Sequence, residues 1–361
     1  MKIKYLILAL LMLFTLSCKV SKTSDVEEPD TPTFIKGADV GWLPQMEVTG
    51  YKFYNKDGKE EDCLKILKSY GINAVRLRTF VDPSNNPQSG HCSKDETVAM
   101  AVRAKKEGMK VMINFHYSDS WADPAKQVKP KAWVNLNFTD LKKALFDYTF
   151  DVISALKNAG VEPEWVQIGN EITPGLLLPE GDSGKNFPQL AALLNEGYDA
   201  VKKASPNSKV ILHVDQGNNN ARFRWWFDEA TKNNAKYDII GLSYYPYWLE
   251  GKPDYTTNIN DLGFNLNDLV SRYGKEVMVV EVGGEDGQDP SLSAEVNALK
   301  IQNTHDLVAS TISKVKEVPD SKGLGVFYWE PQGARSWSRY ALSAWGNDGK
   351  PTKIMDAFLE N

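Results

Sequence analysis

The chain has 361 residues, of which 42% are hydrophobic and 25% are charged, as in globular proteins with a sizeable core. A net charge of −5 does not suit a nucleic-acid-binding protein, which usually carries a basic face. The length allows one large domain or two ordinary ones, and we expect a monomer by default.

The N-terminal segment has the features of an export signal. Two lysines precede an apolar run over residues 5–16, which Ser17 and Cys18 follow. This order is typical of a secretory signal peptide, and the run is too short to span a membrane as a helix. A cysteine at this place resembles a bacterial lipoprotein processing site, although Thr15 stands where such sites usually carry leucine. We predict that residues 1–18 are the signal peptide and that Cys18 becomes the lipid anchor; plain secretion is the alternative.

Residues 19–33 are polar, acidic and contain proline, which predicts a flexible tether. The protein is then expected in the bacterial cell envelope, at the outer membrane or the cell surface, with the lipid anchor as its only membrane contact. Two further cysteines, Cys63 and Cys92, remain. Export permits a disulfide between them, but Cys63 falls on the apolar face of a predicted helix, so two buried free thiols are equally consistent.

Residues 34–361 alternate short apolar runs with segments of helical periodicity. Strands are predicted over 34–40, 72–80, 109–117, 165–171, 209–215, 238–245, 276–282 and 324–330. Helices are predicted over 59–70, 95–107, 139–158, 188–204, 221–233, 266–273, 294–314 and 352–359, several of which end at a glycine. Eight such units predict an α/β fold, a single-domain (β/α)8 TIM barrel. A doubly wound open sheet is the alternative, but no glycine-rich phosphate loop follows any strand.

Polar and aromatic residues gather at the C-terminal ends of these strands, where a barrel of this type carries its active site. The strand-end residues are Asp39, Arg76, Arg78, His116, Asp119, Asn170, Glu171, His213, Asp215, Tyr244, Tyr245, Glu281, Trp329 and Glu330. The strand bodies, in contrast, consist mainly of Val, Ile, Leu and Met. This distribution predicts a polar site at one end of the barrel.

Two of these residues, Glu171 and Glu281, are the pair of carboxylates that glycoside hydrolysis requires. One must donate a proton to the leaving oxygen and the other must remain ionised, so their surroundings must differ. Arg76 and Arg78 share a strand face and are expected to hold Glu281 ionised, whereas Glu171 has the neutral Asn170 beside it. We therefore predict Glu171 as the acid/base and Glu281 as the nucleophile. Along the strand, Gln167, Gly169 and Glu171 are expected to share one face.

Several sequence motifs resemble the arabinogalactan endo-β-1,4-galactanases of glycoside hydrolase family 53. They are Lys36-Gly-Ala-Asp-Val40, Gly71-Ile-Asn-Ala-Val-Arg-Leu-Arg78, His116-Tyr-Ser-Asp-Ser-Trp-Ala-Asp-Pro124, Gly169-Asn-Glu171, His213-Val-Asp-Gln-Gly217, Ser243-Tyr-Tyr-Pro246, Val279-Val-Glu281 and Tyr328-Trp-Glu-Pro331. The resemblance covers residues 34–358. It implies a retaining hydrolase of β-1,4-galactan in pectin, with the same two glutamates in the same roles. Trp329 matches the sugar platform at the cleavage subsite.

We expect the substrate-binding residues to be Asp39, Arg76, His116, Asp119, Trp121, Asn170, His213, Asp215, Tyr245 and Trp329. Trp121, Trp248 and Trp337 follow strand ends and are candidate sugar platforms. After the predicted nucleophile the chain reads Val282-Gly-Gly-Glu-Asp-Gly287, where many family members carry an aromatic residue and a proline. The segment after Trp329 is also unlike the longer, calcium-associated versions.

No spacing resembles a zinc site, so no cofactor is expected. Calcium remains an alternative, with Asp119 and Asp123, or Asp286 and Asp289, as weak candidate ligands. Two other functions stay open: a hydrolase of the same clan that acts on mannan or glucan, and a surface glycan-binding lipoprotein without activity. Because both glutamates are intact, the enzyme is favoured.

Overall fold

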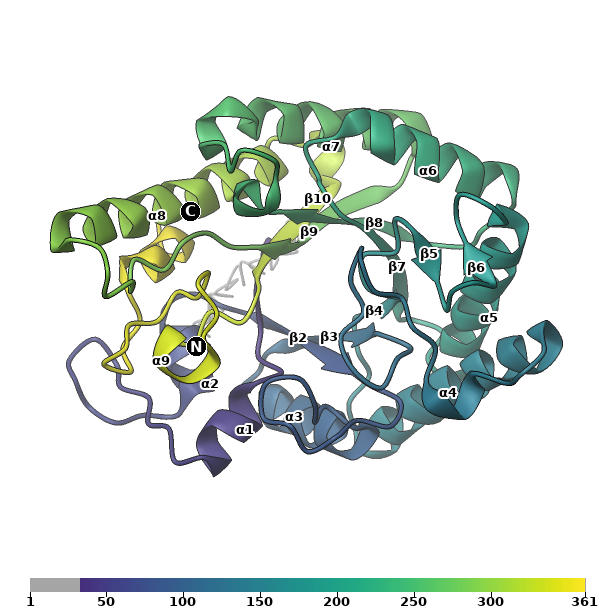
Figure 1. The fold of residues 1–361 in the computed structure, drawn as a ribbon, viewed down its shortest axis with the longest axis horizontal. Coiled ribbons are helices and arrows are strands. Elements are labelled where there is room, and N and C mark those ends of the chain that lie inside the picture. Colours follow the sequence, from purple (N-terminus) through teal and green to yellow (C-terminus); the bar gives the residue numbers. More distant parts are fainter. Residues whose placement is uncertain (1–32, 361) are drawn as a thin grey trace, which may run out of the picture. The chain divides into compact units, whose positions relative to one another are not determined.

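The computed structural model describes residues 33–360, so the predicted signal peptide, Cys18 and the tether up to residue 32 lie outside the described residues. Residues 34–361 form one compact unit. Eight parallel strands close into a barrel, in which each strand pairs with the next along the chain and the last pairs with the first (Figure 1). They are β1 (Ile35–Asp39), β2 (Ala74–Thr79), β3 (Lys110–Phe115), β4 (Trp165–Ile168), β7 (Lys209–Val214), β8 (Ile239–Tyr244), β9 (Glu276–Val282) and β10 (Gly323–Tyr328). The predicted (β/α)8 barrel is confirmed.

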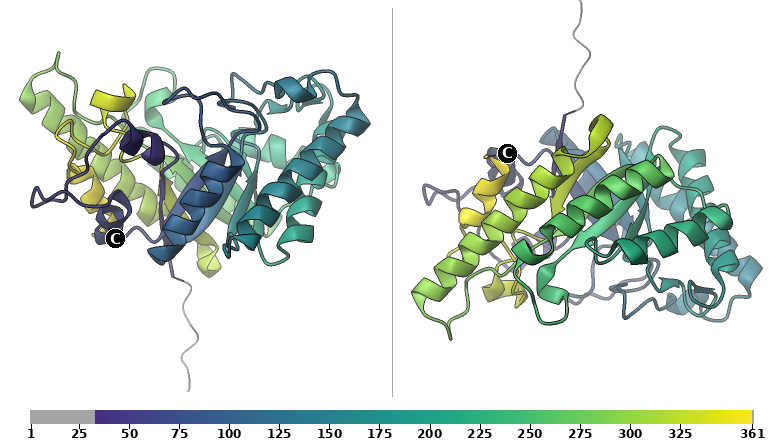
Figure 2. Two further views of the ribbon diagram at one scale, coloured as in Figure 1. Left: turned by 90° about the horizontal axis from the view of Figure 1, so that it is seen from below. Right: turned by 90° about the horizontal axis from the view of Figure 1, so that it is seen from above.

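Long helices surround the barrel, and the two side views in Figure 2 show them packed along its outer wall. They are α2 (Cys63–Ser69), α3 (Lys94–Lys106), α4 (Phe138–Asn158), α5 (Phe187–Ala204), α6 (Asn220–Lys232), α7 (Ile259–Tyr273) and α8 (Ala294–Lys316). Gly71, Gly108 and Gly160 follow three of these helices with positive φ, as predicted from the helix ends. The helix expected over 266–273 begins earlier, at Ile259, and the last predicted helix is the 3-10 segment η5 (Lys353–Phe358).

Short elements within the loops were not predicted, because none is long enough to give a periodic pattern. They are α1 (Leu43–Val48), α9 (Arg335–Ser338), the antiparallel pair β5 (Gly175–Leu176) and β6 (Gly181–Asp182), and the 3-10 turns η1 (Lys131–Trp133), η2 (Pro246–Trp248), η3 (Tyr255–Thr257) and η4 (Pro319–Ser321).

The barrel interior has an apolar layer below a polar one. The lower layer consists of the buried side chains Ile35, Ala74, Met112, Trp165, Ile211, Ile239, Met278, Val280 and Phe327. Gly37 leaves room for the ring of Phe327, because a Cβ at residue 37 would stand 2.1 Å from its Cδ1 atom. Side chains two residues further along the strands, including Arg76, Asn114 and Gln167, form the polar layer. It supports the site described below.

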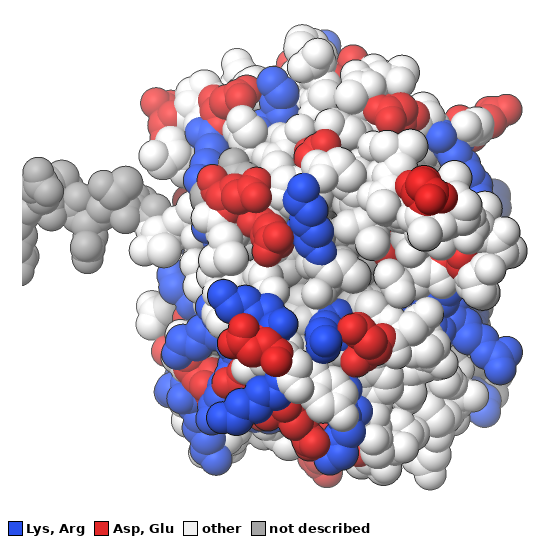
Figure 3. Space-filling view, turned by 90° about the vertical axis from the view of Figure 1, so that its left-hand side faces the viewer, with Lys and Arg blue, Asp and Glu red and all other residues white. Residues whose placement is uncertain are grey.

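Acidic and basic side chains are intermixed on the face drawn in Figure 3, which has no large patch of one charge. Of the helices between residues 33 and 360, none combines the length and apolar character needed to cross a bilayer.

Candidate active site

A cleft of about 650 Å³ opens at the C-terminal ends of the barrel strands. Its lining residues are Asp123, Pro124, Ala125, Glu171, Asp215, Gln216, Ser243, Tyr245, Trp248, Leu249, Glu281, Trp329 and Tyr340. Five residues that the sequence predicted for the site, Glu171, Asp215, Tyr245, Glu281 and Trp329, therefore meet in one cavity. Aromatic rings and carboxylates together form its wall, a combination that suits a ligand with both apolar faces and hydroxyl groups.

Glu281 lies on β9 among groups that donate hydrogen bonds to its carboxylate. Arg76 Nη1 donates to Oε1 at 2.8 Å, and the Tyr245 hydroxyl donates to Oε2 at 3.0 Å. A register shift between β8 and β9 leaves one extra residue on β9 and sets Glu281 opposite Ser243, so its side chain reaches the cleft. Burial and the neighbouring carboxylate raise the pKa of Tyr245 well above its usual value, which keeps its phenol protonated as a donor. Both contacts hold the Glu281 carboxylate in place with donated hydrogen bonds.

Glu171 has different surroundings. It is partly open to the cleft but crowded by protein, and the neighbouring Ser243 hydroxyl can act on its carboxylate as a hydrogen-bond donor. Burial, followed by the negative charge of Glu281, raises the pKa of Glu171 well above its usual value. A carboxyl group of this kind stays protonated at a pH where an ordinary one is ionised, which a proton donor requires.

The backbone at the end of β4 departs from the alternation that the sequence predicted. The strand ends at Ile168, and Gly169 (φ 81°) and Glu171 (φ 46°) both have left-handed backbone conformations. Gln167, Gly169 and Glu171 therefore do not share one face as expected, because the turn directs Asn170 into the barrel beside Gln167. A positive φ in a glutamate is unfavourable and typical of functional turns.

His213 is a neutral imidazole that forms hydrogen bonds with the end of β4 and with Ser243 on β8. Its Nδ1 accepts hydrogen bonds from Gln167 Nε2 at 3.0 Å and from the Glu171 backbone N–H at 3.3 Å. Nε2, 2.6 Å from the Ser243 hydroxyl, must then carry the hydrogen and donate it, which leaves the serine proton for Glu171. Burial and the nearby Arg76 charge lower the pKa of His213 well below its usual value, consistent with this neutral tautomer. His213 thus lies beneath the cleft and acts on Glu171 rather than on a ligand directly.

Arg76 is the centre of the polar layer and is completely buried. Besides Glu281, it donates to Asp39 Oδ1 at 2.9 Å, to Gln167 Oε1 at 3.2 and 3.1 Å, and to Asn170 Oδ1 at 2.8 Å. Burial raises the pKa of Asp39 well above its usual value in spite of the Arg76 charge. Arg76 therefore holds Glu281 from below, and Asp39 fixes the guanidinium of Arg76.

Asn170 and His116 were also expected to bind substrate, and both are buried in this layer. Asn170 Oδ1 accepts from Arg76 and from Asn114, and its Nδ2 donates to the Ala122 carbonyl at 2.9 Å. His116 Nδ1 accepts from the Ala122 backbone N–H at 2.9 Å. These contacts fix the loop after β3 next to the cleft.

Two predicted contacts differ in the structure. Arg78 does not face Glu281; its guanidinium pairs with the buried Glu330 and lies 4.2 Å from the centre of the Trp121 ring. Asp119 does not line the cleft, because its carboxylate accepts backbone hydrogen bonds from Asp82 and Lys131 and shapes the loop.

The predicted sugar platforms separate into three kinds. Trp329 and the 60% exposed Trp248 line the cleft. Trp121 packs against Trp329 with ring centres 5.7 Å apart. Trp337 packs against Trp42 and donates to the Thr49 hydroxyl, so it belongs to the loop framework.

The remaining candidates concern metals and thiols. Asp286 is held by both Arg335 Nε (2.8 Å) and Nη2 (2.7 Å), and Asp289 lies 3.4 Å from Arg335 Nη1, so a cation already faces this pair. In the described part of the chain, no three His, Cys, Asp or Glu side chains are grouped in a way that would hold a metal ion. Cys63 and Cys92 are both buried and free.

Four site residues were not singled out in the sequence analysis, although Ser243 and Gln216 lie within its quoted family motifs. Asn114 and Ser243 stand two positions before His116 and Tyr245, so strand alternation alone could have found them. Gln216 and Tyr340 come from loops and carry no periodic signal.

The site has two carboxylates in different surroundings at the C-terminal end of a (β/α)8 barrel. This arrangement is typical of the active site of a glycoside hydrolase. The family model for glycosyl hydrolase family 53 matches residues 35–357. The chain belongs to this family.

Relatives with assigned names are consistent with this family. The endo-beta-1,4-galactanase of Bacillus subtilis is 36% identical over 82% of this chain and 70% of its own length. An arabinogalactan endo-beta-1,4-galactanase of Humicola insolens is 35% identical over 82% of this chain and 89% of its own length. Among solved structures, a GH53 catalytic domain of Ignisphaera aggregans aligns with a TM-score of 0.81 and 30% identity, covering 91% of this chain and 97% of that one.

Proposed function

We propose that this protein is an endo-acting, retaining β-1,4-galactanase in which Glu171 is the acid/base and Glu281 the nucleophile. The observation that carries the proposal is the unequal pair: Glu281 accepts hydrogen bonds from Arg76 and Tyr245, while burial and Glu281 itself raise the pKa of Glu171. One cleft thus holds a carboxylate suited to attack and a carboxylic acid suited to proton donation.

The reaction has two steps. Glu281 attacks the anomeric carbon while Glu171 gives its proton to the leaving oxygen, which forms a glycosyl-enzyme ester and releases the first sugar product. Glu171, now ionised, takes a proton from water as that water attacks the anomeric carbon and frees Glu281. Ser243 donates a hydrogen bond to Glu171, which supports its ionised state between the steps. Retention requires carboxylates about 5–5.5 Å apart.

The substrate follows from the named relatives and from the shape of the cleft. Relatives at 35–36% identity are named as galactanases. Trp329 and Trp248 offer flat apolar faces for sugar rings, and Asp123 and Gln216 offer hydrogen-bonding groups for hydroxyls. An open cleft of this kind suits the interior of a polysaccharide chain, which is why we propose endo-cleavage.

The test is the product distribution from unbranched β-1,4-galactan, with mannan and a β-1,4-glucan in parallel samples. Short galacto-oligosaccharides and an early fall in viscosity are expected from galactan alone. Turnover of mannan or glucan instead would refute the galactan assignment, and binding of galactan without turnover would favour the glycan-binding alternative.

We also propose that the protein is exported and lipid-anchored through Cys18, since the sequence from residue 2 to Cys18 has the order of a lipoprotein signal. The Cys18→Ser variant, expressed in a bacterium that processes lipoproteins, should lose incorporation of labelled fatty acid and leave the membrane fraction. Unchanged membrane association would contradict the anchor. Calcium at Asp119 and Asp123 is the alternative for a cofactor. Because backbone N–H groups already bind both Asp119 carboxylate oxygens, chelation should leave the activity unchanged, and a loss of activity would favour calcium.

A further inference from the structure

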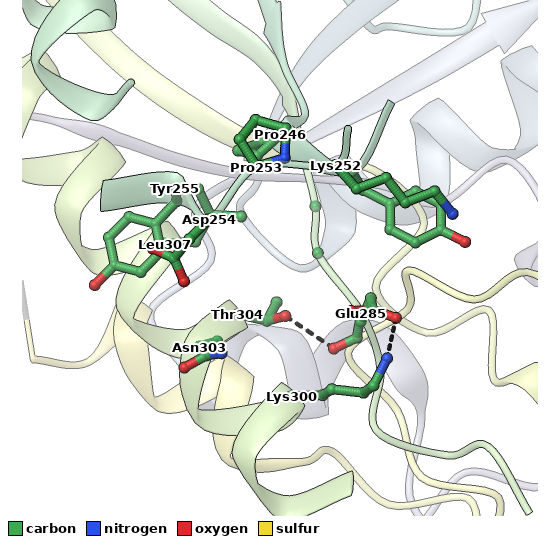
Figure 4. Close-up of a pocket in the computed structure, with 13 residues that line it drawn as sticks. Pro246, Lys252, Pro253, Asp254, Tyr255, Glu285, Lys300, Asn303, Thr304 and Leu307 are labelled. Atoms are coloured by element: carbon green, nitrogen blue, oxygen red, sulfur yellow. Dashed lines mark hydrogen bonds and ion pairs between the residues drawn. The ribbon is translucent and has the colours of Figure 1, made fainter. Parts of the chain in front are cut away.

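A second pocket, of about 230 Å³, lies beside the catalytic cleft. It is formed by the segment after β8, the segment after β9 and the first half of α8 (Figure 4). No residue of this pocket takes part in the mechanism above. The pocket is smaller than the ~300–1,000 Å³ of most ligand sites, so it has room for one small ligand unit rather than for a chain.

The floor of the pocket is bare backbone. At Gly284 a Cβ would stand 2.6 Å from Thr304 Oγ1, so α8 can approach this closely only because the residue is glycine. At Gly283 a Cβ would stand 3.1 Å from the ring of Tyr245, the residue that donates to Glu281. The pocket and the cleft therefore share a wall.

The polar groups around the pocket are balanced in charge. Glu285 pairs with Lys300 at one edge of the pocket, and Asn303 follows on the same helix, α8, as another lining residue (Figure 4). Asp254 and Lys252 contribute one charge of each sign from the loop. The carboxylate, ammonium and amide groups around the pocket have no net charge in sum, so the pocket favours neither an anion nor a cation. They suit a neutral ligand with several hydroxyl groups, which both donate and accept hydrogen bonds.

An aromatic path leads from the cleft to this pocket. Trp248 lines the cleft and Tyr247 lines the pocket, and their ring centres are 4.7 Å apart. Lys252 lies 4.0 Å from the centre of the Tyr247 ring and fixes it against the loop. A polysaccharide that leaves the cleft over Trp248 thus meets a second ring at the entrance to the pocket.

We propose that this pocket is an accessory subsite for one neutral sugar unit of the same polysaccharide that occupies the cleft. This inference rests on the proposed function, because that function identifies the polysaccharide as a galactan. It does not require that the protein cleaves the polysaccharide. The sugar unit belongs either to the main chain beyond the cleft or to a side branch; the recognition chemistry is the same in both cases.

The test fills the pocket without touching the cleft. Asn303→Trp places an indole in the space from an exposed helical position, and Leu299→Trp, on the same helix, 59% exposed and outside the pocket, is the matched control. Both are made in the inactive Glu281→Gln variant, and binding is measured by affinity electrophoresis in gels with linear galactan or with branched arabinogalactan. Asn303→Trp should weaken retention about tenfold, the effect of losing one or two hydrogen bonds, and Leu299→Trp should leave it unchanged.

Each outcome decides the proposal. A loss with branched polymer alone assigns the pocket to a side branch, and a loss with both polymers assigns it to the main chain. Equal retention of Asn303→Trp and Leu299→Trp, or no retention of the parent Glu281→Gln protein, overturns the subsite. Failure of the proposed function would appear separately, as absence of galactan cleavage by the unmodified protein.

Discussion

The ends of β4 and β9 each present one glutamate to the same cleft, but the two glutamates have different neighbours. The end of β9 faces Arg76 and Tyr245, which donate hydrogen bonds to Glu281. The end of β4 presents Glu171 beside a neutral histidine and a serine, with burial as the largest influence on its pKa. The same side-chain type thus becomes suited to two roles through its neighbours alone.

The largest effect is expected from removal of the β9 carboxylate. Glu281→Ala should lower kcat by more than about 10⁴-fold on every substrate, beyond the ~10²–10⁴ that acid–base catalysis supplies, because no covalent intermediate can form. Initial rates on galactan and on an aryl galactoside measure this. Activity of the variant within tenfold of the parent on either substrate would remove Glu281 from the mechanism.

Removal of the β4 carboxylate should discriminate between substrates. Glu171→Ala is expected to lose about 10²–10⁴-fold on galactan, whose leaving alcohol needs a proton, and far less in the bond-breaking step with an aryl galactoside whose phenol leaves unprotonated. A pre-steady-state burst of phenol reports that step. If the burst is lost as completely as in Glu281→Ala, the two roles are assigned wrongly.

The pH dependence of catalysis should show which of the two glutamates carries the proton. Since the pKa of Glu171 is raised, its proton is present below that pKa and lost as the pH rises through it, so kcat/KM on galactan should fall on the alkaline side. In Glu171→Ala, the burst rate with the aryl substrate should lack this alkaline limb. An identical limb in the variant would assign the titration to another group.

A smaller effect is expected when one donor to Glu281 is removed. Tyr245→Phe deletes a 3.0 Å hydrogen bond to a charged group, about 1.5–3 kcal/mol, so kcat should fall about 10- to 100-fold. Tyr244→Phe is the control, because that neighbouring hydroxyl donates to Asn258 and not to a glutamate. Equal losses in both variants would indicate a general packing defect.

The contrast between the two strand ends was only partly visible in the sequence. The eight strands followed from their apolar runs, because both faces of a parallel barrel strand are buried. The gathering of polar residues at the C-terminal ends of these runs was visible in the same way. The partner of Glu281 was also predicted, because a buried arginine such as Arg76 needs an anion. Two strands, β1 and β10, separate its strand β2 from β9, and the two side chains meet inside the barrel.

Three details depended on backbone geometry that no periodicity encodes. The left-handed turn at Gly169 and Glu171 exchanges the faces of Asn170 and Glu171, and the register shift before Ser243 sets the height of Glu281. Arg78 was expected at Glu281 because it shares a face with Arg76, but it stands one layer higher and meets Glu330 instead. Loop residues such as Tyr340 approach the cleft only through the tertiary fold.

The smallest effect should come from the rim of the cleft, where neither glutamate is touched. Trp248 is 60% exposed and lines the cleft, so Trp248→Ala should raise KM about 2- to 10-fold through lost ring stacking of roughly 0.5–1.5 kcal/mol, with kcat unchanged. Trp225→Ala is the matched control, since Trp225 is also exposed, at 44%, but lies on α6 away from the cleft lining. A fall in kcat without a change in KM would mean that this ring orders the reacting groups, and the separation between binding at the rim and chemistry at the two strand ends would then be wrong.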